Sequence, residues 1–264
     1  MDRSICAEKA AELFNKYPAE AKPYIEKILQ STLYIKTDDL ITIVRRVFEK
    51  VIKDTNYNLF IPREIGSEHM IMLAMEDLFI KYPPAEIIYG LADGCFDDGF
   101  AGGADISTNI STNSNTNSNI NNTKINNDYP IVIIDDAVYS SHSMCGYADY
   151  FEMAGIYNKI YCIVGISSST RPEVSELFNA VVLAAKYVDK LRICELFPGE
   201  YEYMYKTFGC ESDQVIPIYF DHKIANEFGS YQFYHKIIKN PVSRHRIDTI
   251  TENDIDKFIQ KIKN

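Results

Sequence analysis

From residue 86 onward, short apolar runs alternate with helix-compatible segments, and this alternation restricts the fold more than any other feature of the chain. The runs have the length of strands, and several are apolar at nearly every position, which indicates strands buried on both faces. The predicted strands are Glu86–Leu91, Ile131–Ile134, Lys159–Ile166, Val181–Val188 and Val215–Phe220. Strands separated by helices predict an α/β fold with a mainly parallel sheet flanked by helices.

The first part of the chain has a different pattern, because its apolar residues recur at helical spacing. Asp38 or Asp39 is a suitable cap for a helix whose apolar stripe runs from Leu40 to Val51. A further helix is predicted from Ser67, as N-cap, to about Ile80, so the motif Gly66-Ser67-Glu68-His69 is explained by helix initiation. We therefore expect a helical N-terminal region over 1–62 and an α/β domain over 63–264.

One segment of the predicted α/β domain is almost entirely Asn, Ser and Thr, from Ser107 to Asn127. Such a composition buries too little apolar surface to offset the entropy lost on ordering. The sequence therefore predicts a disordered insertion over 105–128, placed in a surface loop.

Charge and cysteine usage restrict the partners and the location. The formal net charge is −10 and the pI is about 5.0, whereas proteins that bind a nucleic-acid backbone usually present a basic face. No apolar run approaches the roughly 20 residues that a membrane-spanning helix needs. The six cysteines are scattered without a C-x-x-C pair, and Cys162 lies inside an apolar strand. We therefore expect no nucleic-acid or membrane partner and a reducing, cytoplasmic location.

The candidate site is the stretch from Ile131 to Gly146, in which a buried strand ends in Asp135 and Asp136. In an open α/β sheet, ligands bind at the carboxyl ends of the strands. Successive strand residues point to opposite faces, so the two acids are expected to do different jobs. A hydroxyl-rich turn and the start of a helix follow, and together these features predict a site for a phosphorylated sugar. The turn consists of Tyr139, Ser140, Ser141, His142 and Ser143.

Two other protein classes also place acids after an apolar strand. Nucleotide hydrolases use such acids to bind a metal, and phospho-receiver domains form an acidic pocket from them. The chain has no G-x-x-x-x-G-K-[ST] sequence, which argues against a P-loop enzyme. A receiver domain does not need a hydroxyl-rich anion loop directly after its acids.

The run Asp-Asp-Ala-Val-Tyr-Ser, from Asp135 to Ser140, resembles the signature of the type I phosphoribosyltransferases. The resemblance implies that Asp135 and Asp136 hold the ribose hydroxyls of phosphoribosyl pyrophosphate, and that residues 139–143 grip its 5′-phosphate. It also implies an Mg²⁺ cofactor near the two acids. The expected reaction is transfer of phosphoribose to a nucleobase or similar acceptor, with release of pyrophosphate.

The same resemblance implies two further elements. A pyrophosphate loop would lie near Gly90, Leu91 and Ala92, and a base-recognising hood would include Phe220 and Asp221. The helical N-terminal region is compatible with a hood or with the surface of a homodimer.

Most members of this family have Gly where the chain has Ser141, and a Gly requirement usually reflects a left-handed backbone or close approach to the ligand. The alternative to an enzyme is therefore a binding or regulatory protein that keeps the fold and the phosphate pocket without transfer chemistry. A sugar-phosphate hydrolase is a third alternative.

Overall fold

The computed structural model describes residues 15, 17–62, 65–89, 125, 128–138, 142–153, 155–167, 180–189, 191–208, 214–215, 218–220 and 247–263. The helices are η1 (Ala19–Ala21), α2 (Lys22–Ser31), α3 (Thr37–Ile52), α4 (Ser67–Ala74), α5 (Glu76–Lys81), α6 (His142–Met153), α8 (Ile193–Leu196), α9 (Tyr201–Phe208) and α12 (Glu252–Lys263). The strands are β1 (Leu33–Ile35), β2 (Asn58–Ile61), β3 (Glu86–Tyr89), β4 (Ile131–Val138), β5 (Ile160–Ser167), β6 (Ala180–Tyr187), β7 (Leu191–Arg192), β8 (Gln214–Val215) and β9 (Ile218–Phe220).

Two compact units make up the chain. One contains residues 1–42 and 186–249, and the other contains 43–185 and 250–264. These bounds differ from the division predicted at residues 62 and 63. β2 joins the sheet although it precedes residue 62, and β1 pairs with β9, which places residues from the second half of the chain in the first unit. β2 was not predicted because a buried strand of only four residues shows too little periodicity. The predicted insertion over 105–128 lies outside the described residues, apart from Ile125 and Asp128.

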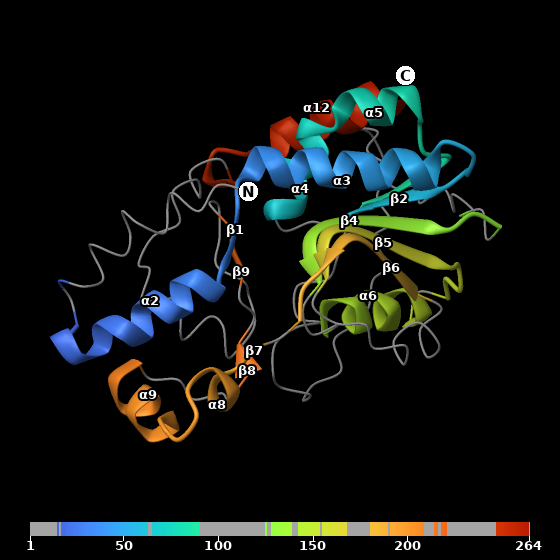
Figure 1. Cartoon of the computed structure of the whole chain (residues 1–264). Helices are drawn as coiled ribbons and strands as arrows, with labels where there is room; N and C mark the ends of the chain where they lie inside the picture. Colours follow the sequence, from blue (N-terminus) through green and yellow to red (C-terminus); the bar gives the residue numbers. More distant parts are fainter. Residues whose placement is uncertain are drawn as a thin grey trace, which may run out of the picture. The chain divides into compact units, whose positions relative to one another are not determined.

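The second unit is built on a five-stranded sheet with the order β3-β2-β4-β5-β6. The pairs β2–β3, β2–β4 and β4–β5 are all parallel. Figure 1 shows α6 on one face of this sheet and α3, α4, α5 and α12 on the other. The predicted α/β fold, with a mainly parallel sheet flanked by helices, is confirmed.

The core between the sheet and α6 is aromatic at its centre. Phe60 of β2 makes an edge contact with Phe151 of α6, with ring centroids 5.2 Å apart, and Tyr147 and Tyr150 pack around the same ring. Cys162 of β5 lies in this core, and its burial agrees with the sequence prediction. Burial on both faces explains why β4 and β5 read as continuous apolar runs.

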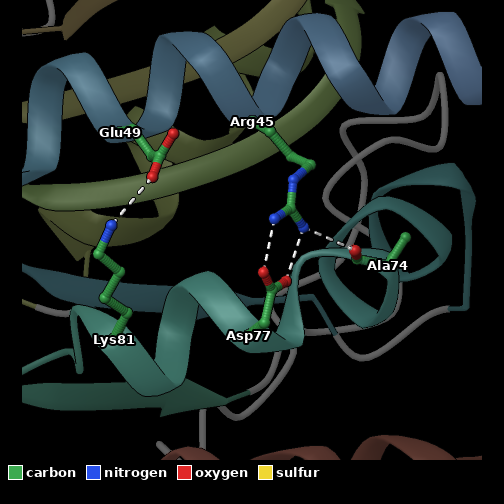
Figure 2. A network of polar contacts seen from close by, with 5 residues as sticks. All are labelled: Arg45, Glu49, Ala74, Asp77 and Lys81. Atoms are coloured by element: carbon green, nitrogen blue, oxygen red, sulfur yellow. Dashed lines mark hydrogen bonds and ion pairs between the residues drawn. The ribbon is translucent and has the colours of Figure 1, made fainter.

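On the opposite face, α5 contacts both α3 and α12. The Phe79 ring of α5 packs on Phe48 of α3 and on Phe258 of α12, at centroid distances of 4.9 and 5.4 Å. Two ion pairs on the surface join α3 to α5, Arg45 with Asp77 and Glu49 with Lys81 (Figure 2). Among the described residues, no helix combines the length and the apolar character that crossing a bilayer requires.

The first unit contains two small sheets, one pairing β1 and β9 in parallel and one pairing β7 and β8 antiparallel. The sequence predicted a single strand over Val215–Phe220, and this is wrong because β8 and β9 belong to different sheets. β8 pairs with β7 and β9 pairs with β1. Aromatic contacts of Tyr24 with Phe197 and Tyr203 pack α2 against the segments around α8 and α9.

Two helix predictions also change in detail. The helix expected from Ser67 to Ile80 is divided at Met75 into α4 and α5, where the Met75 N–H bonds to the Met72 carbonyl in a tighter turn. The N-cap is Gly66 instead of Ser67, since Ser67 is already the first helical residue.

Candidate functional site

The two aspartates lie within β4, near its carboxyl end. The strand continues to Val138, four residues beyond the predicted end at Ile134. Aspartate is unfavourable in strands, which is why the sequence suggested an earlier end. Pairing with β5 holds the extra residues, because Asp135 lies opposite Val164 and Val138 lies opposite Ser167.

The acids point to opposite faces of the sheet, as the alternation along a strand predicts. Asp135 lies on the same face as Ile133, whose partner on β5 is Cys162, and α6 packs over this face. The pKa of the Cys162 thiol is raised, first by burial and then by the negative charge of Asp135. Asp136 lies on the face against which α4 packs.

Burial distinguishes the two carboxylates. Asp136 is only 1% exposed, whereas Asp135 is half-buried. Oδ1 of Asp135 accepts a hydrogen bond from the Asp136 backbone N–H at 2.7 Å. This bond fixes the orientation of the Asp135 side chain. Asp135 is therefore the acid that an incoming ligand reaches more readily.

Of the five residues predicted to form the phosphate loop, 139–143, the structure describes only the last two. Tyr139, Ser140 and Ser141 lie outside the described residues, and His142 and Ser143 form the first positions of α6. The helix thus begins four residues after β4 ends, and its first two residues belong to the segment predicted as the turn. Free backbone N–H groups at a helix N-terminus attract anions. The described strand before this segment and the helix after it agree with the prediction.

The order of the strands places β4 at the position where open α/β sheets bind their ligands. Renumbered along the chain, β3-β2-β4-β5-β6 is the order 2-1-3-4-5, in which the direction of winding reverses between β2 and β4. Ligands of open α/β sheets bind outside the carboxyl ends of the strands at this reversal. The ladder between β2 and β4 includes only Asn58–Ile131 and Leu59–Val132. At the level of the acids, β4 is therefore paired with β5 but no longer with β2.

The structure does not bring the other predicted site residues to this edge of the sheet. Gly90, Leu91, Ala92 and Asp221 lie outside the described residues. β3, which precedes Gly90, is separated from β4 by β2. Phe220 belongs to the other unit, in β9, where its ring is fully buried. Burial gives this ring a packing role, and its role in binding a base stays a prediction.

Sequence reasoning missed β2 and the contacts that His69 makes with the backbone between β2 and α4. His69 of α4 is fully buried and contacts the backbone at Pro62 and at Gly66. The apolar run Leu59-Phe60-Ile61 followed by Pro62 was the available signal.

A magnesium ion fits the chemistry of this edge. Among the described residues, no cluster of three or more His, Cys, Asp or Glu side chains has the arrangement of a metal site. Mg²⁺, however, keeps several waters and is commonly held by one or two carboxylates together with substrate phosphates. The half-buried Asp135 carboxylate supplies an oxygen of this kind.

Comparison with known proteins gives no family assignment. No family model and no curated protein matches the chain. A solved structure titled "Crystal structure of an hypothetical protein" aligns with 96% of this chain and 95% of its own, at 11% identity and a TM-score of 0.30.

Proposed function

We propose that this protein is a Mg²⁺-dependent phosphoribosyltransferase. It binds phosphoribosyl pyrophosphate at the carboxyl end of β4 and transfers phosphoribose to a nucleobase or similar acceptor. One observation carries the proposal: Asp135 and Asp136 lie where β4 passes the reversal of the strand order, and α6 begins four residues after β4 ends. An acid pair followed directly by a helix N-terminus suits a ligand that carries hydroxyl groups and a phosphate.

The two acids have different proposed roles. Asp135, the more accessible one, accepts hydrogen bonds from the ribose hydroxyls and orients the sugar. Asp136 lies one residue further on and faces away from α6. Its negative charge favours the positive charge that develops on the ribose ring as the bond to pyrophosphate breaks. The protein contributes mainly by holding the reactants in position.

The 5′-phosphate is proposed to bind to the segment from Tyr139 to Ser143. The backbone N–H groups at the first turn of α6 and the hydroxyl groups of Ser140, Ser141 and Ser143 are the donors. A bound magnesium ion, held by the Asp135 carboxylate, would offset the charge of the pyrophosphate leaving group. Gly90, Leu91 and Ala92 remain the proposed pyrophosphate loop, and Asp221 remains part of the proposed hood.

We further propose a cytoplasmic location and phosphoribosyl pyrophosphate as the small-molecule partner, without nucleic acid. The net charge of −10 supports the absence of a nucleic-acid partner. Cys162, which is buried in the core, forms no disulfide, and this suits a reducing compartment. A homodimer through the N-terminal helices belongs to the same proposal.

The test is release of pyrophosphate from phosphoribosyl pyrophosphate with Mg²⁺, measured over a panel of nucleobases and with water alone. The proposal predicts release that requires both a base and the intact acids, so Asp136→Asn lowers the rate of turnover. Unchanged turnover in this variant would refute the role of Asp136.

A second function is favoured by Ser141, which stands where the family usually has Gly. In this alternative the protein binds the sugar phosphate as a binding or regulatory protein and transfers nothing. Binding without release over all acceptors would support this alternative. Release with water as the acceptor would instead support a sugar-phosphate hydrolase.

A further inference from the structure

The side of α6 that faces β2 carries two tyrosines, Tyr147 and Tyr150. They are three residues apart, so they lie on one side of the helix. Both rings pack on the ring of Phe60 in β2, at centroid distances of 5.4 and 6.2 Å. Ala148 and Phe151 form the buried stripe of the helix, whereas the two tyrosines beside it are half-buried. Each tyrosine therefore contacts the core and is also partly accessible to solvent.

Phe60 lies where β2 and β4 separate. The last pair of their ladder is Leu59–Val132, so Phe60 is the first residue of β2 beyond it. The strand order reverses between these two strands, and ligands of open α/β sheets bind outside the carboxyl ends of the strands at such a reversal. The Tyr147 ring, which makes an edge contact with Phe60, is therefore held on the β2 side of this reversal.

Asp135 borders the same core cluster that Tyr147 packs against. It lies opposite Val164 of β5, which is a member of the cluster. Its charge also contributes, after burial, to the raised pKa of the thiol of Cys162, another member. Asp135 and Tyr147 thus border one cluster on one face of the sheet, the face that α6 covers (Figure 1).

Tyr147 is the tyrosine nearer to the acids. β4 and β5 are parallel, so α6 starts after the carboxyl end of β4 and runs back along the sheet to the start of β5. Three residues of helix place Tyr147 about 4.5 Å closer than Tyr150 to the carboxyl end of β4. Helical side chains also lean toward the N-terminus of their helix, which for α6 is the direction of that end.

We infer that Tyr147 is a substrate-binding residue whose ring packs on the pentose of the sugar phosphate. Ligand pockets are lined mainly by apolar and aromatic side chains, and a few polar groups set the orientation of the ligand. Asp135 and the start of α6 are the polar groups of the proposed site, and the Tyr147 ring supplies an apolar surface for the C–H groups of the sugar. The inference rests on the proposed function, since it assumes that a sugar phosphate binds beside Asp135.

The test compares Tyr147→Leu, which removes the ring, with Tyr150→Leu as the matched control. Each variant loses an aromatic contact with Phe60 from the same side of α6, so both are expected to be less stable than the wild type. For each full-length protein, calorimetry measures the affinity for ribose 5-phosphate and urea unfolding measures the stability.

We expect Tyr147→Leu to bind ribose 5-phosphate about tenfold more weakly than the wild type, and Tyr150→Leu to bind like the wild type. A tyrosine with a purely structural role would lower stability without changing the affinity of the folded protein. Equal affinities in the two variants, whether both are normal or both are reduced, therefore overturn the inference.

A second measurement uses the fact that the chain contains no tryptophan. Tyr147→Trp and Tyr150→Trp each introduce a single indole on this side of α6. Saturating ribose 5-phosphate should shift the fluorescence emission of Tyr147→Trp and leave that of Tyr150→Trp unchanged. The same response in both variants overturns the inference, and this comparison decides the question if Tyr147→Leu does not fold.

Two further outcomes separate this inference from the proposed function. If the wild type does not bind ribose 5-phosphate, the proposed function fails and this inference fails with it. If the wild type binds and Asp135→Asn binds more weakly, while Tyr147→Leu binds like the wild type, only the inference fails.

Discussion

The ion pair between Arg45 of α3 and Asp77 of α5 can be measured by replacing Arg45 with Met and Asp77 with Asn, singly and together (Figure 2). The contact is bidentate, with Nη1–Oδ1 at 2.6 Å and Nη2–Oδ2 at 2.5 Å. Parallel bonds of this kind are the strongest form of the Arg–carboxylate contact. The side chains are, however, 30% and 66% exposed, so water and salt screen the interaction.

Exposed pairs couple by about 0.2 to 1 kcal/mol, and the bidentate geometry places this pair near the upper end, at about 1 kcal/mol. Arg45→Met should cost more than Asp77→Asn, because Nη1 also donates to the Ala74 carbonyl at the end of α4, at 3.1 Å. That carbonyl has no later partner within its helix. The double-mutant cycle, measured by urea unfolding at pH 7, gives the coupling free energy.

The pH dependence of the coupling provides a second check. The hydrogen bonds from Arg45 hold the pKa of the Asp77 carboxyl below its ordinary value. Its contribution to stability is therefore complete above the unfolded-state pKa, near pH 4, and is lost as the pH falls through the lower folded-state pKa. A coupling below about 0.2 kcal/mol at pH 7, or one that does not fall in acid, would refute this account of the contact.

Two further predictions concern stability. Tyr57→Phe should lower the free energy of unfolding by about 1 to 2 kcal/mol, because the Tyr82 carbonyl oxygen loses the hydroxyl that donates to it at 2.6 Å. Urea denaturation measures this cost, and a value near zero would contradict the prediction. Burial raises the pKa of Tyr57, so the wild type should also lose stability above about pH 10, where the unfolded-state phenol ionises, and the variant should lose less. Deleting residues 107–124 should change the free energy of unfolding by less than about 1 kcal/mol, since loop-closure entropy depends weakly on length, and a larger loss would mean that the segment packs on the fold.

The class of fold could be predicted from the sequence because its strongest signals are local. β4 and β5 are long and buried on both faces, and the first half of β4 and most of β5 are apolar, so both were recognised as buried strands. The helix α3 could also be predicted, because one of its faces is buried and its apolar residues therefore recur at helical spacing.

The predictions that failed depended on tertiary contacts. β2 has four residues, too few for a period to show, yet it pairs with both β3 and β4. β4 extends through two aspartates because β5 pairs with that part of the strand, and a propensity argument does not include this pairing. The residues at 214–220 could not be divided correctly because the two parts pair with strands far away in the sequence.

The candidate site was predictable at the acids and not around them. Asp135 and Asp136 stand out because charged residues in a buried strand are rare. Which of them a ligand reaches depends on the helices packed over each face, and this is visible only in three dimensions.

The central claim is that a phosphorylated pentose binds beside Asp135, and calorimetric titration with ribose 5-phosphate tests it most directly. Asp149→Asn, which removes an exposed carboxylate from α6, is the matched control for Asp135→Asn. The account predicts that the wild type and the control bind alike, and that Asp135→Asn binds about 10- to 100-fold more weakly, the cost of losing a charged hydrogen-bond acceptor. Equal affinity in Asp135→Asn and the wild type, or no binding by the wild type, would contradict the account.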